Sequence, residues 1–205
     1  MVIVERGSAL EPANRTLRTM FEDRKDVFVD LLKWNVPVLA GRFEMDEFDD
    51  LHATYVIVTD ETGDHLGSAR LLRTTRRHIL GSLFAELCSG PPPTGPDIYE
   101  ITRFCLSRRQ GTASRLATRN RLVSALVSHA LTVGIRTYTG VAEIGWLQQI
   151  LAFGWDCRPL GPPRRLDCGA LGALAIAIEA DTPALLAANQ IWSAPAEQPE
   201  LTLAA

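Results

Sequence analysis

Hydrophobic and polar residues alternate along the chain in patterns that predict a succession of helices and strands. Apolar residues recur at three- and four-residue spacing over residues 13–33, which predicts an amphipathic helix. The β-branched and apolar residues at 54–59 and 66–74, separated by a turn at 60–64, predict a hairpin. Further strands are expected at 98–106, 135–141 and 171–178, and further helices at 82–87, 113–133, 144–153 and 181–191.

The order helix, hairpin, strand, helix, strand, helix, strand predicts a single α/β domain with a mixed sheet. We expect this domain to occupy residues 1–192 and residues 193–205 to form a flexible tail. The charged N-terminus predicts no signal peptide, and no apolar run approaches the length of a membrane span. A cytoplasmic protein is therefore expected. The cysteines lack the spacing of metal ligands, so no metal site is predicted.

The formal net charge of −3 conceals a strong asymmetry in where the charges lie. No acidic residue occurs between Glu100 and Glu143, a stretch that is rich in arginine, whereas acids concentrate at 44–50 and 60–64. A basic surface on an acidic chain favours an anionic partner. A solvated helix face explains the same pattern. Nucleic acid is a weaker candidate, because the chain is acidic overall and carries no recognised binding motif.

Three residues near the N-terminus are candidates for holding a flat, charged ligand. Arg24 and Phe28 lie four positions apart on the predicted helix and therefore share a face, and Trp34 follows the helix. A cation beside an aromatic ring is one way to build such a site. The alternative is that Phe28 belongs to the core, Arg24 extends its charged group to solvent, and Trp34 packs over the end of the helix.

Asp46 and Asp49, with the acids around them, crowd negative charge into a short segment. Such crowding is costly unless a cation lies nearby. Arg70 is the obvious candidate for that cation. A solvated acidic loop is the alternative.

Glu100 and Arg103 place two charges inside an otherwise apolar predicted strand. Residues three apart point to opposite faces of a regular strand. If both side chains serve one site, the strand must contain a β-bulge, which we predict near Thr102. The alternative is that one of the two lies in water at an edge.

The segment at 108–113, Arg-Arg-Gln-Gly-Thr-Ala, joins this strand to the long helix. It fits the loose pattern [R/Q]-x-x-G-x-[G/A] of Gcn5-type N-acetyltransferases. Gly111 and the first N–H groups of the helix would allow phosphate oxygens to approach closely. A plain helix N-terminus explains the segment equally well.

Taken together, these residues resemble the pattern of the LuxI-type acyl-homoserine-lactone synthases. That family carries Arg, Phe and Trp near the N-terminus, then Asp-x-x-Asp, an Arg in R-L-L-x-T-T, a Phe, and Glu-x-x-Arg-Phe. The matching residues, in order, are Arg24, Phe28, Trp34, Asp46, Asp49, Arg70, Phe84, Glu100, Arg103 and Phe104. The similarity covers about residues 13–180. Arg73 departs from the Pro that many members carry in R-L-L-P-T-T.

The resemblance implies a Gcn5-type αβα sandwich with a mixed, mostly antiparallel sheet and no cofactor. It implies that acyl carrier protein, or coenzyme A, delivers an acyl thioester to the α-amine of S-adenosylmethionine, which is a substrate. The carboxylate of the amide product then closes the lactone and displaces methylthioadenosine. The product is a quorum-sensing autoinducer.

The resemblance also implies residue roles, with Glu100 as the general base. The other expected catalytic residues are Arg103, Asp46, Asp49 and Arg70. The residues expected to bind S-adenosylmethionine are Arg24, Phe28, Trp34, Arg103 and Phe104. The expected acyl pocket is formed by Phe84, Thr102, Ala142 and Trp146, and the expected carrier-docking surface by Arg108, Arg109, Arg115 and Arg119.

Acyl-chain preference and two other functions stay open at this point. Ala142 or Glu143 stands where members that favour 3-oxo chains often carry Thr, which hints at an unsubstituted or 3-hydroxy chain. A general acyl-coenzyme A-dependent N-acyltransferase of the same fold is the principal alternative. A non-catalytic interaction protein that binds a regulator through its basic face is a second.

Overall fold

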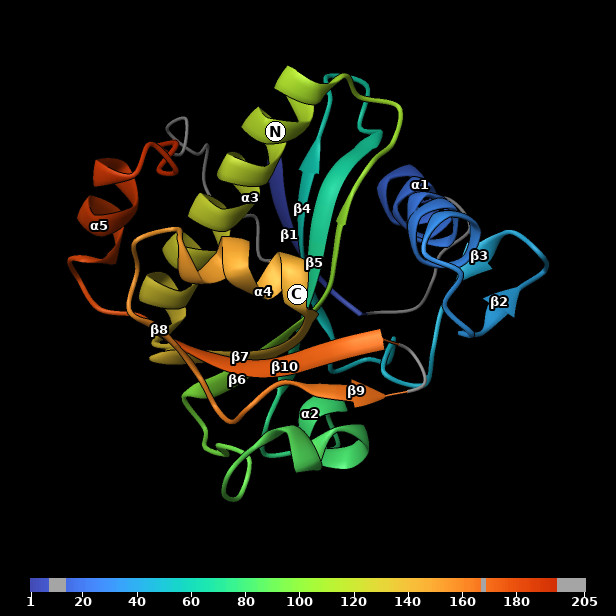
Figure 1. Ribbon diagram of the computed structural model, residues 1–205. Helices are drawn as coiled ribbons and strands as arrows, with labels where there is room; N and C mark the ends of the chain where they lie inside the picture. The colour runs from blue at the N-terminus through green and yellow to red at the C-terminus, as the bar shows by residue number, and fades with distance from the viewer. Residues whose placement is uncertain (8–13, 167–168, 195–205) are drawn as a thin grey trace.

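The protein is built around one twisted sheet with helices on both faces (Figure 1). The computed structural model describes residues 1–7, 14–166 and 169–194, so most of the expected tail lies outside the described residues. The strand order is β1-β4-β5-β6-β7-β10-β8, and β9 pairs with β10. The strands are β1 (Val2–Arg6), β4 (Thr54–Thr59), β5 (His65–Arg73), β6 (Ile98–Leu106), β7 (Thr137–Glu143), β8 (Cys157–Pro159), β9 (Arg164–Leu166) and β10 (Gly169–Ala177).

All neighbouring strands in this sheet are antiparallel except β6 and β7. The parallel pairing runs only from Ile98 and Thr137 to Ile101 and Gly140, although both strands continue beyond it. The chain therefore has the predicted α/β fold with a mixed, mostly antiparallel sheet. A small second sheet pairs β2 (Val38–Leu39) with β3 (Phe43–Glu44).

The helices divide between the two faces of the sheet. The long α3 (Thr112–Val133) and α4 (Ile144–Leu151) cover one face, where α5 (Thr182–Ala188) packs beside α3. The N-terminal α1 (Arg15–Arg24) and the short α2 (Ile79–Leu83) with η2 (Ala85–Leu87) cover the other face. Among the described residues the apolar core forms three clusters, one beneath α3 and α4 and two on the side of α1 and α2. None of the described helices has the length and hydropathy that a membrane crossing needs.

The helix predicted over residues 13–33 is not uniform. It begins as α1 and continues as a π-helix, η1 (Lys25–Leu31). In this segment Leu32 N donates to Val27 O at 2.9 Å, and Trp34 N donates to Phe28 O at 2.8 Å. A π-helical turn is wider than an α-helical one and is common at functional sites. The short strands β1, β2, β3, β8 and β9 were not predicted either.

The predicted bulge in β6 is confirmed. Ser68 of β5 pairs with Cys105, whereas Arg70 pairs with Thr102, so two residues of β6 face one residue of β5. Arg103 is one of those two, and its φ of 49° lies in the left-handed region. An extra residue interrupts the alternation of side chains along the strand. Arg103 therefore reaches the same face of the sheet as Thr102.

The end of α3 gives a test of backbone strain alone. Gly134 caps this helix at φ 80°, and a Cβ there would meet nothing within 4 Å. Gly134→Ala should lower the free energy of unfolding by about 1–2 kcal/mol, because a side chain disfavours that conformation. Urea denaturation measures the change. Gly145→Ala in α4 is the control, because a Cβ at Gly145 also has no heavy atom within 4 Å. This change should leave the free energy of unfolding unchanged or raise it. Equal effects of the two changes would contradict this account.

Candidate active site

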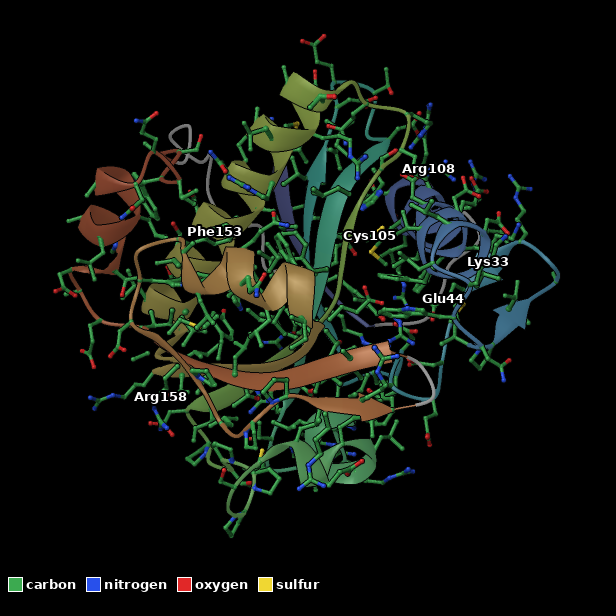
Figure 2. The ribbon with its side chains drawn as sticks, in the orientation of Figure 1. Lys33, Glu44, Cys105, Arg108, Phe153 and Arg158 are labelled. Atoms are coloured by element: carbon green, nitrogen blue, oxygen red, sulfur yellow. The ribbon has the colours of Figure 1, made fainter. Side chains whose placement is uncertain are left out.

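Three arginines and three carboxylates form a buried, charge-balanced network between α1 and the sheet. The arginines come from three different elements, whereas the acids come from one short segment that includes β3. The members are Arg24 of α1, Arg70 of β5, Arg103 of β6, and the acids Glu44, Asp46 and Asp49. Figure 2 shows Glu44 close to η1, on the α1 side of the sheet.

Arg24 is 1% exposed and is held by two acids. Its Nε donates to Glu44 Oε2 at 2.6 Å, and its two terminal nitrogens donate to the oxygens of Asp49, both at 2.9 Å. This second contact is a bidentate pair, the strongest geometry for an arginine and a carboxylate. Burial opposes ionisation of Asp49, but the charges of Arg24 and Arg70 outweigh it and lower the pKa of this carboxyl. The pair is therefore ionised at neutral pH.

Arg70 and Arg103 share Asp46. Arg70 Nη1 donates to Asp46 Oδ1 at 2.6 Å, and Arg103 Nη2 donates to Asp46 Oδ2 at 2.7 Å. Arg70 Nε also donates to Thr102 Oγ1 at 3.0 Å, and Arg103 Nε donates to Glu44 Oε1 at 3.0 Å. Each acid thus joins two arginines, and the network links α1, β5 and β6.

The aromatic residues of the N-terminal segment lie against Arg103 rather than Arg24. The rings of Phe28 and Trp34 are stacked, with centroids 4.9 Å apart and planes at 17°. The guanidinium carbon of Arg103 lies 5.6 Å from the centroid of Phe28 and 6.0 Å from that of Trp34. Arg24 instead lies 4.9 Å from the ring of Phe21. Arg24 is therefore engaged by Phe21 and by its two acids, whereas the ring of Phe28 lies against Arg103.

Glu100 is fully buried, and its carboxylate meets the N-terminus of α2. Its oxygens accept hydrogen bonds from Ile79 N at 2.7 Å and from Leu80 N at 2.9 Å. Burial raises the pKa of Glu100 to about 7, against the opposing effects of these N–H groups and of the charges on Arg70 and Arg103. At neutral pH the group is therefore poised between its acid and base forms, which suits proton transfer.

The bulge divides the expected site residues between the two faces of the sheet. Glu100, Thr102 and Arg103 face α1 and α2. Phe104 faces the other way and packs against Trp146 of α4, with ring centroids 5.2 Å apart. Ala142 belongs to the same apolar core as these two rings, whereas Phe84 packs on the α2 side. The structure therefore does not bring Phe104 to the ion network.

The four arginines expected to dock a carrier differ in their surroundings. Arg108 and Arg115 are exposed, and Figure 2 shows Arg108 at the surface near α1. Arg109 is exposed as well, but its guanidinium pairs with Asp23 at 2.9 Å. The guanidinium of Arg119 lies 4.9 Å from the ring of Phe153 and bonds to Asn120.

Comparisons with known proteins decide the family. A model of the family described as autoinducer synthase matches residues 9–171. The chain belongs to the autoinducer synthase family. An acyl-homoserine-lactone synthase of Ralstonia solanacearum is 34% identical over 84% of this chain and 87% of its own length.

Two solved structures of acyl-homoserine-lactone synthases are also similar to this autoinducer synthase. LasI is 28% identical with a TM-score of 0.78, over 91% of this chain and 94% of its own. BjaI, a coenzyme A-dependent synthase solved with S-adenosylmethionine and isopentyl-coenzyme A, is 25% identical with a TM-score of 0.80, over 98% and 95%. An N-acetyltransferase of Lactobacillus plantarum, 15% identical with a TM-score of 0.55 over 87% and 98%, shares the fold alone. This synthase is accordingly an acyltransferase that produces a quorum-sensing acyl-homoserine lactone.

Sequence reasoning missed Glu44 as a member of the site. Glu44 was grouped with the other acids at 44–50, yet it is fully buried and binds both Arg24 and Arg103. Glu47, three residues on, is exposed and pairs with Arg77 at the surface. No pattern in the sequence separates Glu44 from Glu47, because which of the two is buried follows only from the placement of β3.

The network makes a stability prediction for Glu44. Glu44→Gln should lower the free energy of unfolding by about 3–5 kcal/mol, because two buried guanidinium groups lose part of their charge balance. Chemical denaturation followed by circular dichroism measures it. The matched control is Glu47→Gln, which breaks only a surface pair and should change stability by less than about 1 kcal/mol. A small effect at both positions would show that the buried network is not needed for folding.

Proposed function

We propose that Glu100 is the general base that takes the proton from the α-amine of S-adenosylmethionine. A carboxylate of ordinary pKa is a poor base at neutral pH, and burial has raised this pKa to about 7. Its two N–H partners hold it in one orientation. The deprotonated amine then attacks the thioester carbonyl and forms the amide, while the thiolate leaves and takes up a proton.

Lactone formation follows as a second displacement in the same proposal. A carboxylate oxygen of the acylated product attacks the γ-carbon of the methionyl part, which is bound to the sulfonium sulfur. That carbon–sulfur bond breaks, its electron pair passes to sulfur, and methylthioadenosine leaves as a neutral thioether. The positive charge of the sulfonium and the negative charge of the carboxylate are both consumed, so the step needs no further reactant.

S-adenosylmethionine is proposed to bind beside the stacked rings of Phe28 and Trp34. Two features support this location: the rings lie against the ion network, and Trp34 remains partly exposed. An aromatic face attracts a sulfonium and also stacks with adenine. The guanidinium group of Arg24 is already paired with Glu44 and Asp49. We therefore assign Arg24 to ordering the N-terminal segment rather than to binding S-adenosylmethionine directly.

The acyl chain is proposed to lie where β6 and β7 stop pairing. Beyond Ile101 and Gly140 the two strands continue without a shared ladder, and Phe104, Ala142 and Trp146 line the apolar side nearby. The small Ala142 leaves room for carbon atoms and offers no hydroxyl to a 3-oxo group, which supports an unsubstituted or 3-hydroxy chain. Phe84 and Thr102 would contact the chain from the α2 side. N–H groups at the bulge would stabilise the oxyanion.

The proposed acyl donor is a thioester on an acidic carrier protein, which docks at Arg108 and Arg115. These two side chains are exposed near the start of α3, on a stretch of chain without acidic residues. Opposite charges across such a contact mainly accelerate association. Coenzyme A is the alternative donor, in line with the coenzyme A dependence of BjaI.

The single observation that carries the proposal is the convergence of Glu100, Arg103 and Phe28 on one face of the sheet. Incubation with S-adenosylmethionine and an acyl donor tests it directly. Release of methylthioadenosine together with an acyl-homoserine lactone is the expected result. Acylation of another amine without methylthioadenosine would favour a general N-acyltransferase.

Glu100 gives a prediction with a defined pH dependence. The base form exists above the pKa, so kcat/KM should rise as the pH increases through about 7. Glu100→Gln should lower kcat by about 10²–10⁴-fold and remove that rise. Steady-state kinetics between pH 5.5 and 9, roughly the range in which such a base titrates, measure both effects. An unchanged pH profile in the variant would mean that another group titrates.

The docking surface gives a separate prediction. The double change Arg108→Glu and Arg115→Glu should raise KM for an acyl-carrier donor by about tenfold at low ionic strength, because attraction becomes repulsion. The effect should shrink as salt is added, and KM for S-adenosylmethionine should stay the same. An equal increase in KM for acyl-coenzyme A would argue against a carrier-specific surface.

A further inference from the structure

Beside the proposed substrate site lies a second polar cluster that the reaction scheme does not use. His65 of β5 is fully buried between two side chains. Its Nδ1 lies 2.7 Å from Asp23 Oδ2, and its Nε2 lies 2.9 Å from Ser68 Oγ. Asp23 belongs to α1 and directly precedes Arg24. The cluster thus connects the sheet to the end of the helix that supports the ion network.

The donors and acceptors of this cluster follow from its burial. Burial lowers the pKa of His65 despite the neighbouring Asp23, so the ring is neutral and has one N–H. Asp23 is ionised, since the bonds from His65 and Arg109 outweigh its burial and lower its pKa. A carboxylate only accepts, so Nδ1–H donates to Asp23 and Nε2 accepts from the Ser68 hydroxyl.

Ser68, His65 and Asp23 are connected in the same order as in serine hydrolases. Ser68 is only 1% exposed, however, and a substrate would have to reach its hydroxyl through the sheet and α1. A nucleophile needs access to its substrate. The arrangement therefore fixes structure rather than performing acyl transfer.

Arg109 supplies the positive charge that a neutral His65 cannot. Its Nη2 donates to Asp23 Oδ2 at 2.9 Å and to the carbonyl oxygen of His65 at 3.0 Å, while its Nε donates to Ser107 Oγ at 3.1 Å. These bonds connect the loop after β6 to β5 and to α1. The side chain of Asp23 is 6% exposed, so losing its cation would leave a nearly buried charge unbalanced.

We propose that Arg109 is a positioning residue for the S-adenosylmethionine half of the site, and not part of the carrier-docking surface. By neutralising Asp23 it fixes the junction between α1 and η1, which carries Arg24 and Phe28. The role depends on the proposed binding of S-adenosylmethionine beside Phe28. This positioning role distinguishes Arg109 from its neighbour Arg108. Among the described residues, Arg108 bonds to neither α1 nor β5.

The test compares Arg109→Ala and Arg109→Lys with Arg15→Ala. Arg15 is the matched control: its side chain is 55% exposed and pairs with Asp64, whereas that of Arg109 is 54% exposed. Arg109→Ala should raise KM for S-adenosylmethionine about tenfold and change KM for the acyl donor by less than about twofold. Arg109→Lys, which retains the charge, should recover much of the loss. Arg15→Ala should leave both constants near those of the unmodified enzyme.

A double-mutant cycle distinguishes loss of the Arg109–Asp23 ion pair from a general folding defect of the Arg109→Ala variant. Asp23→Asn eliminates the charge that Arg109 balances, so adding Arg109→Ala to it should cause little further change in KM. An increase in KM for the acyl donor alone would make Arg109 a docking residue and overturn the proposal, as would unchanged constants in Arg109→Ala. A direct measurement of S-adenosylmethionine binding to the Phe28→Ala variant tests the proposed substrate site separately from the role of Arg109. Full binding there would refute the proposed substrate site, whatever Arg109 does.

Discussion

A buried guanidinium group needs a carboxylate beside it, and this requirement organises the side of the sheet that α1 covers. Arg24, Arg70 and Arg103 come from a helix and two strands that are far apart in sequence. The acids that neutralise them all lie within residues 44–49. Within that segment only Glu44 belongs to a strand, and the ion pairs of its acids fix it between α1 and the sheet. The N-terminal layer and the sheet are therefore ordered together.

The bulge in β6 is the second constraint, because it decides which side chains can meet. A regular strand would send Arg103 to the apolar side, where α3 and α4 pack. The extra residue brings it to the face of Glu100 and sends Phe104 to the opposite face. The ion network and the contact of Phe104 with Trp146 thus occupy opposite sides of one strand. Beyond Ile101 the same strand no longer pairs with β7.

The strand pattern, the bulge and most of the ion network could be predicted from the sequence. Residues 54–59 and 98–106 are strands as expected, and the two charges in the second strand required a bulge. The rest depended on contacts that no local pattern records. Glu44 resembles its exposed neighbour Glu47 until β3 is placed, and the partner of Arg109 lies 86 residues away. The π-helical segment that carries Phe28 was also missed, because α-helical spacing was assumed over the whole of residues 13–33.

The carboxylate of Glu100 is held by two peptide N–H groups of α2, and no side chain within the described part of the chain bonds to it. Side-chain substitutions along this helix therefore leave in place the donors that fix the carboxylate. Phe84, the residue that follows α2, is one position where a new side chain would not touch either donor. Sequence change can in this way accumulate along α2 while the backbone that orients Glu100 is inherited unaltered.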